Sequence, residues 1–138
     1  MKLKYALLDK RPIQDPVFWS NGLFFVNAAL WLYAGLPWCA LAIVWAGVTS
    51  LLYHRSVEMN SIFHKLDQSA AVMALVCTVG FSLSTMNLVE WVIVMLFLGV
   101  GLKLKAVAHE SGEDYEGWHT AWHVCVFGGQ AILALSHA

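Results

Sequence analysis

Long apolar runs separated by short polar connections dominate the pattern of this chain. A helix needs about 20 apolar residues, roughly 17–25, to cross the hydrocarbon core of a bilayer. Runs of about that length occupy 17–34, 37–53, 68–86, 88–104 and 117–136. Because these runs take up most of the chain, the pattern predicts an all-α polytopic membrane bundle of about five transmembrane helices, built as one integral-membrane domain over 1–138.

The composition agrees with a membrane protein and excludes several other classes. Hydrophobic residues make up 59% of the 138 residues and charged residues only 12%, which lies outside the usual range for a soluble domain. The three cysteines form no CxxC pair, so we interpret them as small buried side chains. A formal net charge of −1 gives no reason to expect a nucleic-acid partner.

The basic residues are distributed on one side of the predicted topology. Four precede the first run, two lie between the second and third runs, and two lie at the end of the fourth: Lys2, Lys4, Lys10, Arg11, Arg55, Lys65, Lys103 and Lys105. The opposite connections contain none. The positive-inside rule then places the N-terminus in the cytoplasm and the C-terminus outside.

Ionisable and hydroxyl side chains gather at the cytoplasmic ends of three of these helices. Ser50 and His54 are four residues apart in SLLYH, and His119 and His123 are four apart in WHTAWHV, so each pair shares a helix face. Asp67 opens the third run from the same side. Such groups within or at the edge of a membrane helix call for a partner or a function.

These five residues have a direct chemical interpretation. Three neutral imidazoles, His54, His119 and His123, with one open position match the ligand count of a catalytic zinc site. Asp67 would accept a hydrogen bond from the zinc-bound water or from a ligand imidazole, and the Ser50 hydroxyl would bond that water or a substrate carbonyl.

Each residue also has a simpler interpretation. An HxxxH pair occurs incidentally on helix faces, Ser50 can bond back to a helix carbonyl, and Asp67 can serve only as a helix N-cap. Their coincidence at one membrane level favours a shared metal site.

His64 is interpreted as an interfacial loop residue rather than a fourth ligand. The acidic stretch 109–117 is expected to be a solvated connection, and neither His109 nor His137 is assigned a role.

The order of these motifs resembles the CREST superfamily of transmembrane proteins, which includes the alkaline ceramidases and the progestin and adiponectin receptors. The signature reads SLLYH ending at His54, FHKLD ending at Asp67, and HTAWH from His119 to His123. The resemblance implies one zinc ion on the three histidines, Asp67 and Ser50 beside the metal-bound water, and hydrolysis of a lipid amide.

Two features depart from that pattern. Family members usually have seven membrane helices, whereas this chain has room for five; loss of one helical hairpin keeps the direction of the last helix but removes two walls of the lipid cavity. Resemblance to the ceramidase branch would also imply a calcium-assisted site built from acidic residues near the first helix. Here that region offers Asn21, Asn27 and only Asp15, so calcium is not predicted.

The predicted function is therefore zinc-dependent hydrolysis of a membrane lipid, at the amide or ester of an N-acyl lipid such as ceramide. Asp67 would act as general base and then acid, and Ser50 would stabilise the oxyanion. Alternatives are a non-catalytic zinc-stabilised receptor or scaffold, a haem-binding electron carrier and, less well matched, a di-iron hydroxylase. Protomers of a homo-oligomer would be one way to replace the missing walls.

Overall fold

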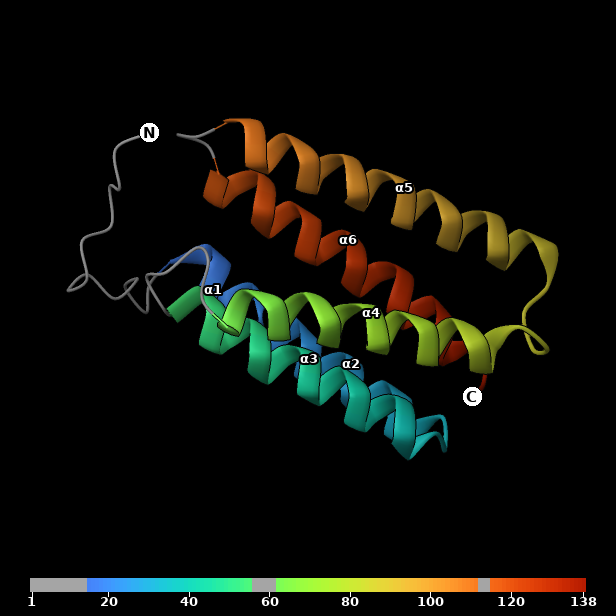
Figure 1. Ribbon diagram of the computed structural model, residues 1–138. Helices are drawn as coiled ribbons and strands as arrows, with labels where there is room; N and C mark the ends of the chain where they lie inside the picture. The colour runs from blue at the N-terminus through green and yellow to red at the C-terminus, as the bar shows by residue number, and fades with distance from the viewer. Residues whose placement is uncertain (1–14, 56–61, 112–114) are drawn as a thin grey trace.

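The computed structural model describes residues 15–55, 62–111 and 115–138, and this part of the chain is helical with no strands (Figure 1). Its helices are α1 Pro16–Ser20, α2 Gly22–Tyr33, α3 Pro37–Arg55, α4 Ile62–Ser82, α5 Leu88–Ser111 and α6 Tyr115–Leu135. The all-α prediction is confirmed, and every predicted run coincides with helix over most of its length.

The first predicted run is interrupted at Asn21. Asp15 caps α1 by accepting a 2.8 Å hydrogen bond from the Val17 amide, and Pro16 follows it at the first helical position. The Asn21 side chain then donates to the Val17 carbonyl at 2.7 Å, where a helical backbone amide would otherwise bond. The chain continues into α2 through Gly22, a poor helix former. The predicted run over 17–34 is therefore divided into two helices, and whether it crosses the membrane stays a prediction.

Two further boundaries differ from the predicted ones. Helix α4 begins at Ile62, so Asp67 lies inside the helix and does not cap it, and His64 is a helical residue rather than a loop residue. Helix α5 continues to Ser111 and α6 begins at Tyr115, so much of the expected acidic loop is helical. An apolar run identifies only the apolar segment of a helix, whereas the helical backbone hydrogen bonds continue into the polar sequence beside it.

Three helices are long and apolar enough to cross a membrane: Pro37–Arg55, Ile62–Ser82 and the Leu88–Ala108 part of α5. Among the described residues, the other two predicted runs do not meet that measure. Helix α2 has only 12 residues. Helix α6 contains buried polar side chains, including His119, His123 and Gln130, which lower its hydropathy. Five crossings therefore remain a prediction.

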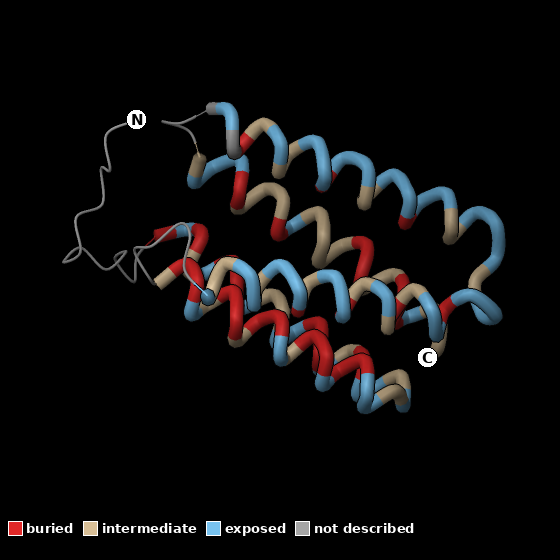
Figure 2. Tube along the Cα trace, in the orientation of Figure 1, coloured by how far each residue is buried: buried red, intermediate tan, exposed pale blue. Residues whose placement is uncertain are grey.

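Helix α6 is the central helix of the described bundle. It contacts α1, α2, α4 and α5, while α3 packs against α4 and α2 on the other side. Burial follows this arrangement, since most buried positions lie on α2, α3 and α6 and the outer faces of α4 and α5 are exposed (Figure 2). In the part of the chain that the structure describes, the backbone of α5 packs closely against α6 and not against the other helices.

Glycines permit the closest helix crossings. A Cβ atom on Gly47 would lie 2.8 Å from the Cβ of Phe24, and one on Gly128 would lie 2.6 Å from a ring carbon of Phe97. Both distances are far below van der Waals contact. Small residues at such crossings allow the backbones to approach, as in membrane helix packing, so these two glycines fix how α2 meets α3 and how α5 meets α6.

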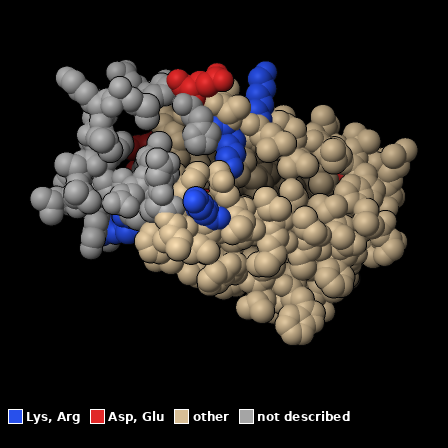
Figure 3. Space-filling view, in the orientation of Figure 1, with Lys and Arg blue, Asp and Glu red and all other residues tan. Residues whose placement is uncertain are grey.

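The described basic residues gather at one end of the bundle (Figure 3). Arg55 ends α3, Lys65 lies in the first turn of α4, and Lys103 and Lys105 lie toward the end of α5. Their one-sided distribution is confirmed for these four. The other four predicted positions, Lys2, Lys4, Lys10 and Arg11, lie outside the described residues.

Candidate metal centre

Three histidines from two helices meet at the basic end of the bundle. His54 lies in the last turn of α3, and His119 and His123 lie in the first turns of α6. All three are buried, and one nitrogen of each lies within 4.8 Å of the others. Their rings pack edge to face with centroid separations of 4.7, 4.8 and 5.7 Å. The sequence prediction of this trio as a cluster is confirmed.

The cluster has dimensions that suit a small tetrahedral ion. Zinc–nitrogen bonds of about 2.0–2.1 Å at tetrahedral angles place ligand nitrogens about 3.3 Å apart. The Nε2 atoms of His54 and His119 are already 3.1 Å apart. Since the widest separation within the trio is 4.8 Å, small side-chain rotations bring all three nitrogens to one ion. The three imidazoles therefore fit a zinc ion with one further position left for another ligand.

Ser20 orients the third histidine. Its hydroxyl donates to the Val17 carbonyl at 2.9 Å and lies 2.7 Å from Nδ1 of His123. With its one proton directed to the Val17 carbonyl, the hydroxyl accepts the second bond from Nδ1–H of His123. His123 is then the Nδ1–H tautomer, whose Nε2 carries a lone pair. Nε2 is buried and has no hydrogen-bond partner among the described residues, as expected for a metal-ligating nitrogen held by an outer hydrogen bond.

Aromatic side chains enclose the cluster. The ring of Phe24 packs edge-on against His123 at 5.7 Å, and Trp122 lies 5.0 Å from the same imidazole. Tyr115 covers His119 at 4.9 Å. An apolar shell of this kind limits solvent access and lowers the local dielectric, which strengthens charge interactions inside it.

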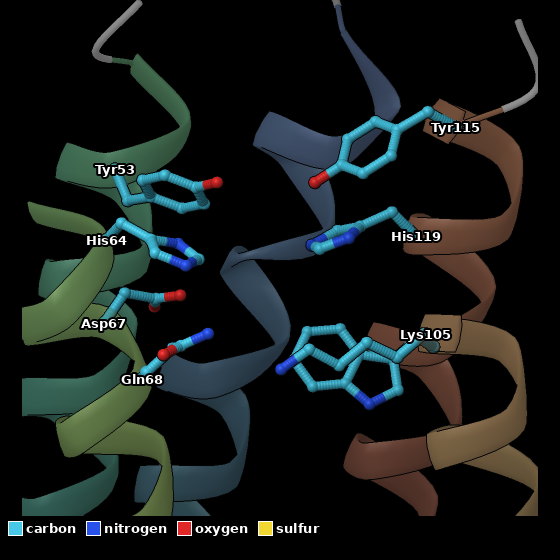
Figure 4. A pocket seen from close by; sticks show the side chains of 8 residues that line it. Tyr53, His64, Asp67, Gln68, Lys105, Tyr115 and His119 are labelled. Atoms are coloured by element: carbon cyan, nitrogen blue, oxygen red, sulfur yellow. The ribbon is translucent and has the colours of Figure 1, made fainter. Parts of the chain in front are cut away.

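Asp67 faces the cluster from α4. Its carboxylate accepts a hydrogen bond from the hydroxyl of Ser50, which is itself buried one turn before His54 on α3. Asp67 and His119 both border a cavity of about 10 Å³, enough for roughly one water molecule. Figure 4 shows Asp67 and His119 on opposite walls of this cavity. All five residues predicted from the sequence therefore lie together.

The cavity also contains a residue that sequence reasoning assigned only to topology. Lys105 extends from α5 into the cavity, toward the wall that carries Asp67 and Gln68 (Figure 4). Its Nζ lies 4.8 Å from the centroid of the Trp122 ring. Lys105 lies one helical turn after Gly101, which packs against Trp122, and this contact between α5 and α6 is given by the structure and not by the sequence.

The remaining histidines lie outside the trio. His64 borders the cavity and packs against Tyr53 at 4.8 Å, so it stands beside the site rather than in the cluster. His137 lies at the opposite end of the bundle, where Nε2 is 3.1 Å from the Ser82 hydroxyl. The side chain of His109 and the residues Glu113 and Asp114 lie outside the described part of the structure.

Two cysteines predicted as small buried side chains also meet. The Sγ atoms of Cys39 on α3 and Cys77 on α4 are 3.6 Å apart, at the end of the bundle away from the histidines. Cys39 is buried and Cys77 is half-buried, while Cys125 lies apart on α6. This contact belongs to the packing of α3 against α4.

Comparison with known proteins gives no family for the chain: no family model matches it, and neither do curated proteins or solved structures.

Proposed function

We propose that this protein is a zinc-dependent hydrolase that cleaves the amide or ester bond of an N-acyl membrane lipid such as ceramide. The observation that carries the proposal is the buried trio of His54, His119 and His123, with a carboxylate across a water-sized cavity. Three protein ligands and a nearby carboxylate are typical of hydrolytic zinc sites, and a histidine trio is one such ligand set. The resemblance of the three motifs to the CREST superfamily supports the same chemistry.

Each nearby side chain has a defined part in this proposal. Zinc, when bound, polarises an acyl carbonyl and lowers the pKa of a coordinated water. The Asp67 carboxylate takes a proton from the attacking water and delivers it to the leaving nitrogen or oxygen. The Ser50 hydroxyl donates a hydrogen bond to the Asp67 carboxylate, so we assign it the positioning of that carboxylate ahead of the predicted oxyanion contact. Ser20 holds His123 in the tautomer that binds metal.

The position of the site suits a lipid substrate. The trio lies at the basic end of the bundle, which the positive-inside rule assigns to the cytoplasmic face. The candidate membrane-crossing helices α3, α4 and α5 surround it or border its cavity. A scissile bond just below the lipid headgroups would reach this depth, with the acyl chain among the helices.

Metal analysis tests the first half of the proposal. Purified protein should contain close to one zinc per chain, and His119→Ala should lose most of it because two imidazoles hold zinc too weakly. His137→Ala is the matched control, since it removes a histidine at the other end of α6. Equal zinc in both variants would overturn the three-histidine assignment.

The second half is tested at Asp67. Asp67→Asn keeps the size and a hydrogen-bonding oxygen but loses the basic carboxylate, so hydrolysis of a long-chain ceramide should fall at least about 100-fold. Zinc content should stay at the wild-type level. Glu110→Gln makes the same chemical change at an exposed position near the same end and should leave turnover unchanged.

These measurements also separate the hydrolase from its alternative. If zinc-loaded wild-type protein cleaves no amide or ester lipid, the zinc-stabilised receptor or scaffold becomes the better interpretation. If Asp67→Asn cleaves ceramide at the wild-type rate, the assignment of Asp67 to proton transfer is wrong.

A further inference from the structure

The two lysines near the end of α5 face different surroundings. Lys103 is exposed on the outer surface of the bundle, whereas Lys105 is half-buried and borders the cavity. Lys105 shares its helix face with Gly101, which packs on Trp122, and with the buried Ala108. The contact between α5 and α6 therefore directs Lys105 toward the site, while Lys103, two residues away, points elsewhere.

The inward direction of Lys105 is unusual for its location. A lysine near the end of a membrane helix can extend its long side chain to the interface, where its ammonium is hydrated. Here the ammonium lies over the face of Trp122 at 4.8 Å, and Lys105 borders the same cavity as Asp67. A cation held on an aromatic face inside a half-buried cavity is placed to meet an anion.

The charge balance at the proposed metal site also favours binding of an anion. With three neutral imidazoles and a divalent ion, the ammonium of Lys105 adds to the positive charge, and among the described residues that line the cavity only the Asp67 carboxylate opposes it. The remaining positive charge in a half-buried site favours a ligand that brings negative charge. The amide of Gln68 and the hydroxyl of Tyr115 border the same cavity and offer further hydrogen-bond donors.

An open groove leads away from this cavity along α4. Gln68 borders both, and the groove, of about 560 Å³, is lined further by Lys65 and Ser69 and by the exposed apolar side chains of Val72, Met73 and Val76. The described residues that line this groove all belong to α4. Polar donors at one end and apolar side chains along the rest match a headgroup followed by an acyl chain.

We propose that the substrate is an acyl lipid with an anionic group, a phosphate or carboxylate, near the scissile bond, and that Lys105 binds that group while the acyl chain follows the α4 groove. This rests on the proposed lipid hydrolase function, and within the class of N-acyl lipids it makes those that carry an anionic group better substrates than neutral ceramide. Lys105 is then a specificity residue, distinct from the residues that hold metal or transfer the proton.

Binding of hexadecyl phosphate to the zinc-loaded full chain in uncharged detergent tests the proposal without needing turnover. Lys105→Gln should weaken the affinity about ten-fold or more, the usual effect of losing a hydrogen bond between charged groups. Lys103→Gln is the matched control for general surface attraction. It should bind hexadecyl phosphate about ten-fold more tightly than Lys105→Gln does. Lys105→Arg keeps the positive charge and should retain most of the affinity.

Two further probes identify what is bound. Hexadecanol lacks the anion, so its affinity should be the same in wild type and in Lys105→Gln. Inorganic phosphate lacks the chain and should bind far more weakly than hexadecyl phosphate. Equal losses in the Lys103 and Lys105 variants, no loss in Lys105→Gln, or equal affinity for inorganic phosphate would each overturn the proposal. Failure of the hydrolase proposal is read separately, from zinc-loaded wild type that binds the probe but cleaves no lipid.

Discussion

Replacing Ser20 with alanine tests whether the hydrogen bond behind His123 prepares the metal site. The change removes only the hydroxyl, which is buried and bridges the Val17 carbonyl and Nδ1 of His123 at 2.9 and 2.7 Å. Without it, the ring loses the acceptor that keeps the proton on Nδ1. We expect Ser20→Ala to bind zinc more weakly while the helices remain folded.

The size of the effect follows from this one bond. A buried donor left without its acceptor costs about 1–3 kcal/mol. The metal-free protein can relieve that cost by turning the ring or moving the proton to Nε2, whereas the zinc-bound protein cannot, because Nε2 is then a ligand. The cost therefore appears as lost affinity, about 5- to 150-fold at 1.4 kcal/mol per tenfold. Removing an outer hydrogen-bond partner of a metal ligand typically lowers the metal affinity about 10–100-fold, which agrees with this range.

Competition with a fluorescent zinc chelator measures the dissociation constant directly. Ser69→Ala is the control, since among the described residues that hydroxyl bonds the Leu66 carbonyl, on the exposed surface of α4, at 3.0 Å. Ser69→Ala should bind zinc like wild type. If Ser20→Ala keeps the wild-type dissociation constant, the tautomer assignment for His123 fails, and with it the argument that Nε2 is prepared to bind metal.

Two other predictions concern the frame around the site. Reporter fusions after Lys105 should report the cytoplasm and fusions after Ala138 the exterior, because the basic residues mark the cytoplasmic side; the reverse pattern would place the site at the other face. Gly47→Leu should lower the free energy of unfolding by about 1–3 kcal/mol, measured by thermal unfolding in detergent, because its Cβ would meet the Phe24 Cβ at 2.8 Å. Gly80→Leu is the control, since a Cβ there meets nothing within 4 Å, and equal losses in both would show that the Gly47 crossing is not tight.

The helices and the composition of the site were predictable because both depend on local pattern. Apolar runs of sufficient length specify helices, and residues four apart share a helix face, which pairs Ser50 with His54 and His119 with His123. Alternating chain direction then brings the end of α3 and the starts of α4 and α6 to one end of the bundle. Exact helix ends were not predictable, because Asp67 and His64 lie in polar sequence that continues a helix beyond its apolar part.

The partners of the site depended on packing between helices. Ser20 and His123 are 103 residues apart, and no spacing rule connects them. Lys103 and Lys105 are equivalent as basic residues at a helix end, yet only Lys105 faces the cavity. The rotation of each helix about its axis decides such contacts, and that rotation is set where side chains interlock, as at Gly101 against Trp122. Periodicity specifies which residues share a face, whereas only the tertiary structure decides what that face meets.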